Sequence, residues 1–222
     1  MISVDVNEGN VTVKVLNMVY LLQTDIKRLT LGYSGYREVM QSIKGNRHVK
    51  RVIHSRERNR KRDRRYKIAN VIANTAKQLN AVVVLENLPK RCPKNMISNV
   101  NDKKLRHRIY QAGFRSLIKV IEEKCLERGV SVVKVDPRGT SSTCPFCNSK
   151  LMRGDAPRQL KCPKCNVEMG RDVVAVFNLE KRGLTLKGHV PFVPMPDEST
   201  PEVAVLPMKV WMRRKFLPSH FI

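Results

Sequence analysis

Three acidic side chains stand out by their position relative to the predicted secondary structure. Asp5 lies within an alternating apolar stretch, Glu86 ends a continuous apolar run, and Asp172 begins a predicted helix. A carboxylate at the end of a hydrophobic strand is costly to desolvate and tends to persist where a cation compensates it. Three carboxylates in a basic surround provide the oxygen ligands that two Mg²⁺ or Mn²⁺ ions need. Such ions would activate a water and stabilise the leaving 3′ oxygen of a phosphodiester.

The spacing of these acids leaves simpler roles open. Asp172 is also what the dipole of a helix favours in its first turn. Asp5 is also compatible with a carboxylate that faces solvent from the edge of a strand. The sequence positions therefore nominate the three acids as metal ligands without establishing them as one site.

Four cysteines form two CxxC pairs, Cys144 with Cys147 and Cys162 with Cys165, and fourteen residues separate the pairs. Each CxxC turn brings two thiolates to one side of a tight backbone knuckle, and two knuckles complete a tetrahedral shell that suits Zn²⁺. Because all four positions are filled, we predict a structural zinc ion. Nearby cations are expected to offset its negative charge and to approach phosphate; they are Lys150, Arg153, Arg158, Lys161 and Lys164.

The other two cysteines, Cys92 and Cys125, have no partner at ligand spacing. Cys125 falls within the apolar rhythm of a predicted helix, and a free cysteine there behaves as a small buried hydrophobe. We therefore predict that neither of them binds the zinc ion.

The charge of the chain points to a polyanionic partner. Its 43 Lys and Arg residues outnumber 19 Asp and Glu residues, which gives a net charge of +24 and a pI near 10.3. This excess favours nucleic acid, although a ribosomal protein or a protein bound to an anionic membrane surface would have a similar charge. No apolar run reaches about 18 residues and no signal peptide is evident, so we expect a protein of the prokaryotic cytoplasm, associated with the nucleoid, that does not enter the membrane.

Much of the positive charge lies in one predicted helical segment. Residues 44–67 contain twelve Lys or Arg residues against only Glu57 and Asp63. The alternative to a binding surface is a solvated charged helix, but this ratio favours contact with phosphates. Aromatic residues make up 5% of the chain, so backbone contact is expected over base stacking. The predicted contacts are Arg56, Arg60, Lys61, Arg64 and Arg65.

The order of predicted elements suggests how the acids are positioned. Period-two alternation predicts a hairpin and a third strand at residues 2–23, and β-branched runs predict two further strands that end at Glu86 and Val135. An RNase H-like α/β fold has this order, with a mixed sheet flanked by helices and, here, an inserted zinc ribbon with four cysteine ligands. In that fold the first and fourth strands are neighbours, so Asp5 and Glu86 should converge. The predicted helices span residues 35–80, 103–128 and 171–182.

Four ordered motifs resemble the C-terminal half of TnpB, a transposon-encoded, RNA-guided nuclease related to type V CRISPR effectors. Residues 2–7 look like the first RuvC motif and residues 84–88 like the second. Residues 140–165 look like the family's zinc ribbon, and residues 171–178 look like the third RuvC motif. The resemblance implies a metal-dependent DNA endonuclease with Asp5, Glu86 and Asp172 as the ligands of catalytic Mg²⁺ or Mn²⁺. It also implies DNA and a guide RNA as partners, and it leaves the oligomeric state open.

The resemblance divides the chain into a RuvC core at 1–139 with a basic helical segment at 35–80, a ribbon at 140–169, a final helix at 170–183 and an irregular tail at 184–222. Gly170 and Val174 stand where the family often has Asp and Asn. We expect the region that in the family helps hold guide RNA, N-terminal to the first RuvC motif, to be missing. The alternative function is a catalytically idle DNA- or RNA-binding protein or regulator of transposition, and the fold by itself does not separate cutting from strand joining.

Overall fold

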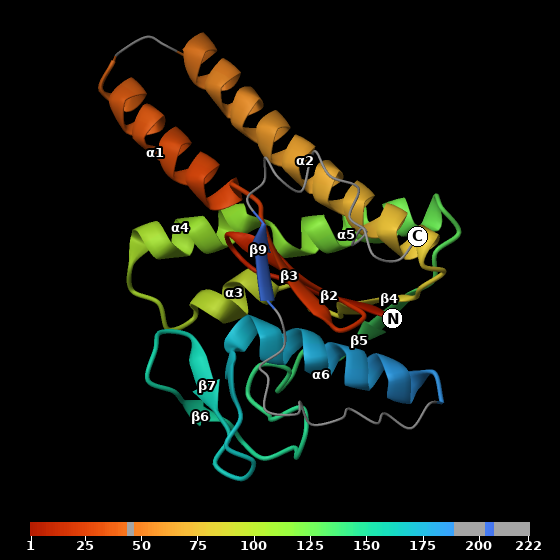
Figure 1. The fold of residues 1–222 in the computed structure, drawn as a ribbon. Coiled ribbons are helices and arrows are strands. Elements are labelled where there is room, and N and C mark those ends of the chain that lie inside the picture. The colour runs from red at the N-terminus through yellow and green to blue at the C-terminus, as the bar shows by residue number, and fades with distance from the viewer. Residues whose placement is uncertain (44–46, 189–202, 207–222) are drawn as a thin grey trace.

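A six-stranded mixed sheet forms the centre of the protein. The computed structural model describes residues 1–43, 47–188 and 203–206 of the chain. The strands lie in the order β5-β4-β1-β2-β3-β9, with β1 to β3 antiparallel and β4 and β5 parallel to β1 (Figure 1). Their bounds are Ile2–Val6 (β1), Asn10–Val15 (β2), Met18–Gln23 (β3), Val83–Glu86 (β4), Val132–Val135 (β5) and Val203–Leu206 (β9). The predicted opening hairpin and third strand are confirmed.

The alternation along β1 and β4 assigns their side chains to the two faces of the sheet. Val4 lies opposite Leu85 in the parallel β1–β4 ladder, and both side chains join the large core on the side of α2 and α5. Asp5 and Glu86 are the next residues along, so they point to the opposite face and end up side by side. The predicted convergence of these two acids therefore follows from the strand order and register.

Helices cover both faces of this sheet. The helices are α1 (Ile26–Ser42), α2 (Arg47–Gln78), α3 (Cys92–Ile97), α4 (Lys103–Ala112), α5 (Phe114–Leu126) and α6 (Arg171–Leu186). The C-terminal part of α2 and all of α5 pack on one face, and α6 packs on the other (Figure 1). None of the described helices is long and apolar enough to cross a membrane.

The packing of α6 against the sheet depends on a glycine and a buried ion pair. A β-carbon on Gly183 would come within 2.6 Å of a methyl group of Val84, so only glycine permits this close approach. Nearby, the Lys14 ammonium lies 2.8 Å from the Glu180 carboxylate, and both side chains are largely buried. These contacts fix the helix that carries Asp172.

The cysteine module folds as a small three-stranded antiparallel sheet between β5 and α6. Its strands are β6 (Met152–Arg153), β7 (Gln159–Lys161) and β8 (Glu168–Gly170). Buried Cys144 and Cys162 share an apolar cluster with Val19 of β3 and Val174 of α6. The module is therefore attached to the central sheet and α6 through a common set of packed side chains.

The helices differ from the sequence prediction in four places. The basic segment predicted to start near residue 35 is instead a helical hairpin whose first helix begins at Ile26, a residue that packs into the interior. The helix predicted over 103–128 breaks at Gly113, and α3 was not predicted at all. The last helix continues past 183 to Leu186.

The tail predicted to be irregular also contributes a strand. Residues 203–206 pair in parallel with β3 and extend the sheet at its outer edge. A strand of four residues is too short to establish a period in the sequence, whereas the open edge of β3 offers unpaired backbone groups that select this pairing. The rest of the tail beyond Gly188 lies outside the described residues.

The break at Gly113 has a structural cause that predicts a measurable effect. Gly113 has φ +65°, and a β-carbon there would collide with the guanidinium of Arg65. Arg65 donates to the carbonyls of Gln111 and Ala112 at 3.5 and 3.3 Å, and so satisfies the C-terminal end of α4. Gly113→Ala should therefore destabilise the protein by about 2 kcal/mol, from the strained φ and the displaced cap.

Thermal unfolding with matched glycine variants checks this prediction. Gly32→Ala is the control, because Gly32 lies in α1 with open space around its Cα. Alanine there should leave stability unchanged or raise it by up to about 1 kcal/mol. Equal melting temperatures for the two variants would contradict the proposed strain at Gly113.

Candidate active site and metal centre

The three predicted acids line one pocket at the carboxyl end of β1 and β4. Asp5 comes from β1, Glu86 ends β4, and Asp172 lies in the first turn of α6. The pocket is also lined by Thr140 from the loop after β5 and by Arg171. Elements far apart in the sequence thus bring together the side chains that the sequence nominated.

Asp5 is the most deeply buried of the three acids, with 8% of its surface exposed. Burial, and then the negative charges of Glu86 and Asp172, raise the pKa of its carboxyl to about 7. The side-chain amide of Asn7 opposes this by donating a hydrogen bond to Asp5 Oδ2 at 2.8 Å. A nearby cation would stabilise the ionised form of this buried carboxyl, which is otherwise disfavoured.

Glu86 is oriented by a hydroxyl group. The Thr140 Oγ1 lies 2.9 Å from Glu86 Oε1, and Thr140 itself is buried. Burial raises the pKa of Glu86, while the Thr140 hydrogen bond and the charge of Arg182 lower it. Thr140 and Arg182 thus favour the ionised carboxylate that a metal requires.

Asp172 is held by an ion pair with the cysteine module. The Arg158 guanidinium lies 2.5 Å from Asp172 Oδ1. Arg158 was predicted to offset the charge of the zinc site, and its partner is instead this acid. Because a metal ion would take the same oxygen, Arg158 and the metal would compete for Asp172.

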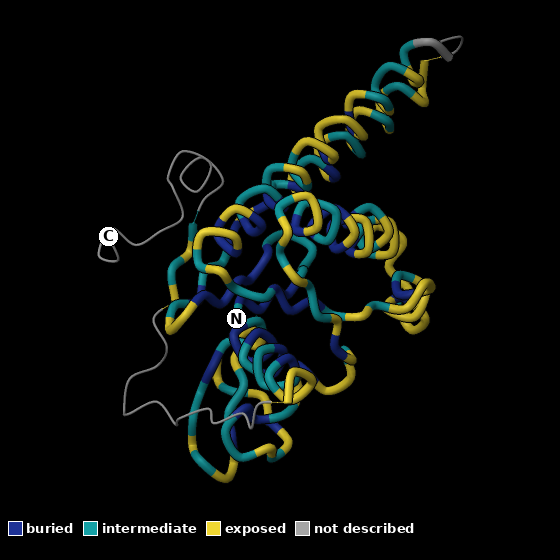
Figure 2. The backbone as a smooth tube through the Cα atoms, turned by 90° about the vertical axis from the view of Figure 1, so that its right-hand side faces the viewer, coloured by how far each residue is buried: buried dark blue, intermediate teal, exposed yellow. Residues whose placement is uncertain are grey.

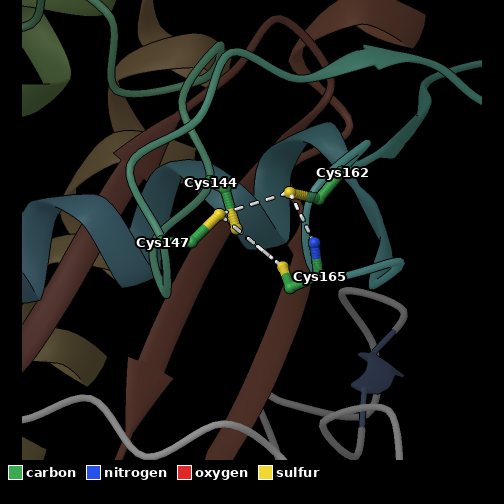
Figure 3. A group of neighbouring side chains, drawn as sticks. All are labelled: Cys144, Cys147, Cys162 and Cys165. Carbon is green, nitrogen blue, oxygen red and sulfur yellow. Dashed lines mark hydrogen bonds between the residues drawn. The ribbon is translucent and has the colours of Figure 1, made fainter.

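The four cysteine thiols converge at one point, as predicted (Figure 3). Their sulfur atoms all lie within 4.8 Å of one another, and three of the pairs are separated by 3.4, 3.5 and 3.8 Å. A tetrahedral zinc ion with Zn–S bonds of about 2.3 Å needs sulfur pairs about 3.8 Å apart. The donor set and its size therefore fit zinc. Among the described residues, the three carboxylates do not form so compact a set.

The remaining two cysteines stay apart from this centre. Cys125 is fully buried in the main core, as predicted. Cys92 is also buried, and its side chain lines the pocket that contains the three acids.

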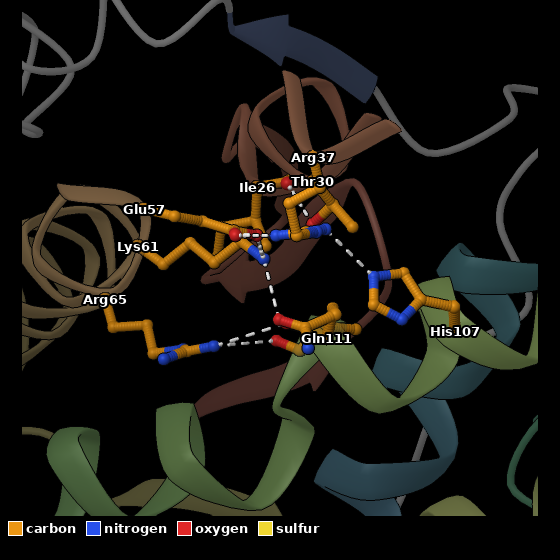
Figure 4. Close-up of polar contacts among 9 residues, drawn as sticks. Ile26, Thr30, Arg37, Glu57, Lys61, Arg65, His107 and Gln111 are labelled. Carbon is orange, nitrogen blue, oxygen red and sulfur yellow. Dashed lines mark hydrogen bonds and ion pairs between the residues drawn. The ribbon is translucent and has the colours of Figure 1, made fainter. Parts of the chain in front are cut away.

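The predicted nucleic-acid contacts divide into two groups. Arg56 and Arg60 are exposed on the α1–α2 hairpin, which projects from the body of the protein (Figure 2). Lys61 is only 3% exposed, so its prediction as a phosphate contact is wrong. Its ammonium lies 2.5 Å from Glu57 Oε1 and 2.9 Å from Gln111 Oε1 (Figure 4).

Arg65 and Arg64 also differ from the expectation. Arg65 reaches the end of α4 and is half-buried there, so it connects α2 to α4 (Figure 4). Arg64 is half-buried next to Asp63, with a guanidinium nitrogen 3.7 Å from the carboxylate. At Lys61 and Arg65 the physical reason is that one side of the basic helix turns inward, where these two cations satisfy Glu57 and the carbonyls at the end of α4.

Sequence reasoning missed the residues that orient the acids. Asn7 directly follows the first strand and Thr140 lies just before Cys144. Both side chains are neutral, so the charge pattern of the sequence does not identify them. Their proximity to Asp5 and Glu86 arises from the turn after β1 and from the path of the loop between β5 and the cysteine module. The available signals were the position of Asn7 two residues after Asp5 and the position of Asn7 and Thr140 within the motifs that carry the family resemblance.

Comparisons with known proteins agree with this architecture. Residues 114–179 match the family model "Cas12f1-like, TNB domain". A TnpB-like protein of Methanocaldococcus jannaschii is 31% identical over 194 residues, which cover 81% of this chain and 68% of that protein. The CRISPR-associated endodeoxyribonuclease Cas12f2 of a Micrarchaeota archaeon is 29% identical over 54% of this chain and 23% of that protein.

Solved structures share the fold. The Cas12f1 chain in a cryo-EM structure of the Cas12f1–sgRNA–target DNA complex superposes with a TM-score of 0.61 and 19% identity, over 82% of this chain and 49% of that chain. The protein therefore spans about half the length of that Cas12f1 chain. With a related TnpB-like protein matched over two thirds of its length and the fold shared with Cas12f1, this chain belongs to the TnpB/Cas12f family.

Proposed function

We propose that this chain is a divalent-metal-dependent endonuclease that hydrolyses phosphodiester bonds of DNA. The observation that carries the proposal is the pocket that gathers Asp5, Glu86 and Asp172 from β1, β4 and α6. Two Mg²⁺ or Mn²⁺ ions bound by these oxygens would supply the activated water and stabilise the leaving 3′ oxygen. Asn7 and Thr140 hold two of the carboxylates in place, and Arg171 beside them favours the approach of a phosphate.

DNA as the substrate and a guide RNA as a partner are supported by the relatives. The name of Cas12f2 describes an endodeoxyribonuclease, and the solved Cas12f1 structure holds a guide RNA with its target DNA. The net charge of +24 supports binding of either nucleic acid. In this proposal the chain acts in transposon-associated, RNA-guided cutting, and zinc fills the four-thiol centre as a structural ion.

A second candidate function is nucleic-acid binding without catalysis. It is favoured by the ion pair that occupies Asp172 and by the exposed cations of the α1–α2 hairpin. Cleavage of labelled single- and double-stranded DNA in Mg²⁺ or Mn²⁺, with and without a guide RNA, separates the two candidates. Glu86→Gln and Asp172→Asn should each lower the rate about a thousandfold, which corresponds to about 4 kcal/mol of transition-state stabilisation.

The control for that assay is Glu168→Gln, since Glu168 pairs with Lys161 on the cysteine module, away from the pocket. Wild-type rates should be retained in it. Tight DNA binding with no metal-dependent cleavage by the wild type would favour the second candidate.

The exposed cations of the hairpin should contribute to affinity through phosphate contacts. Arg56→Ala/Arg60→Ala is expected to weaken binding of DNA or RNA and to reduce the salt dependence of the affinity by about two charges. The measurement is fluorescence anisotropy with a labelled duplex across a range of salt concentrations. Lys119→Ala/Lys187→Ala removes the same charge from exposed positions on α5 and just after α6, outside the hairpin, and is the control. Equal salt slopes for the two double variants would contradict a specific role of the hairpin.

A further inference from the structure

The loop between β5 and the cysteine module brings a buried hydroxyl to Glu86. Thr140 is 3% exposed, and its Oγ1 lies 2.9 Å from Glu86 Oε1. The same Oγ1 lies 2.9 Å from the carbonyl of Pro137. A hydroxyl has one proton, and the bond to an ionised carboxylate is the stronger of the two. Thr140 is therefore placed to donate to Glu86 when that carboxylate is charged.

Helix α6 holds this loop at several points. Asn178 is buried, and its side-chain amide donates to the carbonyls of Thr140 and Thr143 at 2.8 Å each. One turn later on the same face, Arg182 donates to the carbonyl of Asp136. Both ends of the loop and its centre are thus attached to the helix that also carries Asp172.

The same helix continues the attachment into the first zinc knuckle. Lys181 donates to the carbonyl of Pro145 at 2.9 Å and to Asn148 Oδ1 at 2.8 Å. The conformation at Thr140 is therefore set by α6 on one side and by the knuckle of Cys144 on the other. A chain of hydrogen bonds runs from α6 through the loop to the carboxylate of Glu86.

These hydrogen bonds matter for metal binding because Mg²⁺ demands near-ideal octahedral geometry from its ligands. A ligating carboxylate that is free to rotate meets that demand in only part of its orientations. Asp5 receives a comparable bond from Asn7 at 2.8 Å, so each of the two strand carboxylates has one neutral donor. Loss of such outer hydrogen bonds in metal sites typically costs about 10- to 100-fold in metal affinity or activity.

We propose that Thr140 and Asn178 are positioning residues for Glu86: Thr140 fixes the carboxylate through its hydroxyl, and Asn178 fixes Thr140 through the loop backbone. This inference rests on the proposed metal-dependent function. It assigns to the sequence just before the zinc module a role in preparing the metal site. Neither residue contacts the reacting phosphate in this assignment.

The test measures metal binding separately from cleavage, with the full, zinc-loaded chain. Mn²⁺ binding followed by electron paramagnetic resonance and the Mg²⁺ dependence of DNA cleavage are compared for wild type, Thr140→Val, Thr140→Ser and Asn178→Ala. Thr140→Val should weaken Mn²⁺ binding about 10-fold or more and raise the half-activating Mg²⁺ concentration by the same factor. Thr140→Ser keeps the hydroxyl and should bind within about threefold of wild type.

Thr143→Val is the matched control, because it removes the same hydroxyl from the same loop. Thr143 is half-buried, and its hydroxyl donates to the carbonyl of Gly139 at 2.9 Å. The variant should bind Mn²⁺ as wild type does. Zinc content and melting temperature identify a variant that has lost the fold, and Thr140→Val should match wild type in both.

The outcomes separate this inference from the proposed function. If Glu86→Gln weakens Mn²⁺ binding while Thr140→Val does not, the positioning role is overturned and the proposed function stands. If wild type binds Mn²⁺ without cutting DNA, weaker Mn²⁺ binding by Thr140→Val still supports the positioning role. If wild type binds no Mn²⁺ at the pocket, both the proposed function and the positioning role are overturned.

Discussion

Asp5→Asn is expected to abolish metal-dependent cleavage and, in the same protein, to raise its thermal stability in Mg²⁺-free buffer at pH 8. In the proposed function, the loss of activity follows because Asp5 would be a charged ligand of the catalytic metal. The gain in stability follows from the burial of Asp5, whose pKa is raised to about 7 from an ordinary value of 3.8. Ionising Asp5 in the folded protein at pH 8 costs up to about 4 kcal/mol relative to the unfolded chain.

The sign of this effect gives it a characteristic pH dependence. A folded-state pKa above the unfolded value means that the penalty is absent below about pH 3.8, grows between pH 4 and 7, and is complete above pH 7. The stability gained by Asp5→Asn should therefore be small at pH 4.5 and reach several degrees in melting temperature at pH 8. In wild type, a proton competes with the metal for Asp5, so the apparent Mg²⁺ affinity should fall as the pH drops below 7.

Thermal unfolding from pH 4.5 to 8, with the zinc ion retained, measures this prediction. Asp155→Asn serves as the control because Asp155 is exposed on the cysteine module. It should change the melting temperature by less than about 2 °C at every pH, since exposed substitutions cost little. A stability gain for Asp5→Asn that does not vary with pH would exclude a buried, raised-pKa carboxyl as its cause.

Removal of zinc is expected to unfold the cysteine module and abolish cleavage. Cys144 and Cys162 are fully buried and share a cluster with Val19 and Val174, so loss of a metal from the four thiols would expose apolar surface that reaches β3 and α6. The binding free energy of a structural zinc site is about 10–16 kcal/mol. In so small a module this free energy contributes directly to folding, because the site does not exist in the unfolded state. The module also carries the loop that positions Thr140.

A zinc assay with limited proteolysis measures this effect. Wild type should hold one zinc per chain, and Cys162→Ser should lose it and become sensitive to protease within residues 144–170. Cys125→Ala is the control, because Cys125 lies in the main core and is not one of the four clustered thiols. It should keep its zinc. Full cleavage activity after zinc loss would show that the module is dispensable for the active site.

Much of the fold could be predicted because its signals are local. Period-two alternation identified the hairpin of β1 and β2, and the apolar run before Glu86 identified a central strand. The two CxxC spacings identified a four-thiol centre, because a knuckle is formed by adjacent residues. Even the meeting of Asp5 and Glu86 could be predicted, since it requires only that two neighbouring strands run parallel and in register.

Other features could not be predicted, because they depend on which side of an element meets the rest of the protein. Lys and Arg residues occur on most sides of α2 between Arg56 and Lys67, and only packing against α1 and α4 turns Lys61 inward to Glu57. The break at Gly113 similarly depends on Arg65, which lies far earlier in the chain and occupies the space of a side chain. No local pattern contains this information.

The sequence by itself thus determined the chemistry available to this protein: three carboxylates, four thiols and an excess of cations. The tertiary structure alone decided how these groups are held. In the folded protein Asp172 pairs with Arg158 and Lys61 is buried. The loop of Thr140 packs against α6, and its hydroxyl reaches Glu86. The physical reason is that hydrogen bonds and ion pairs between distant segments form only after the sheet and α6 have packed, and no spacing along the chain encodes them.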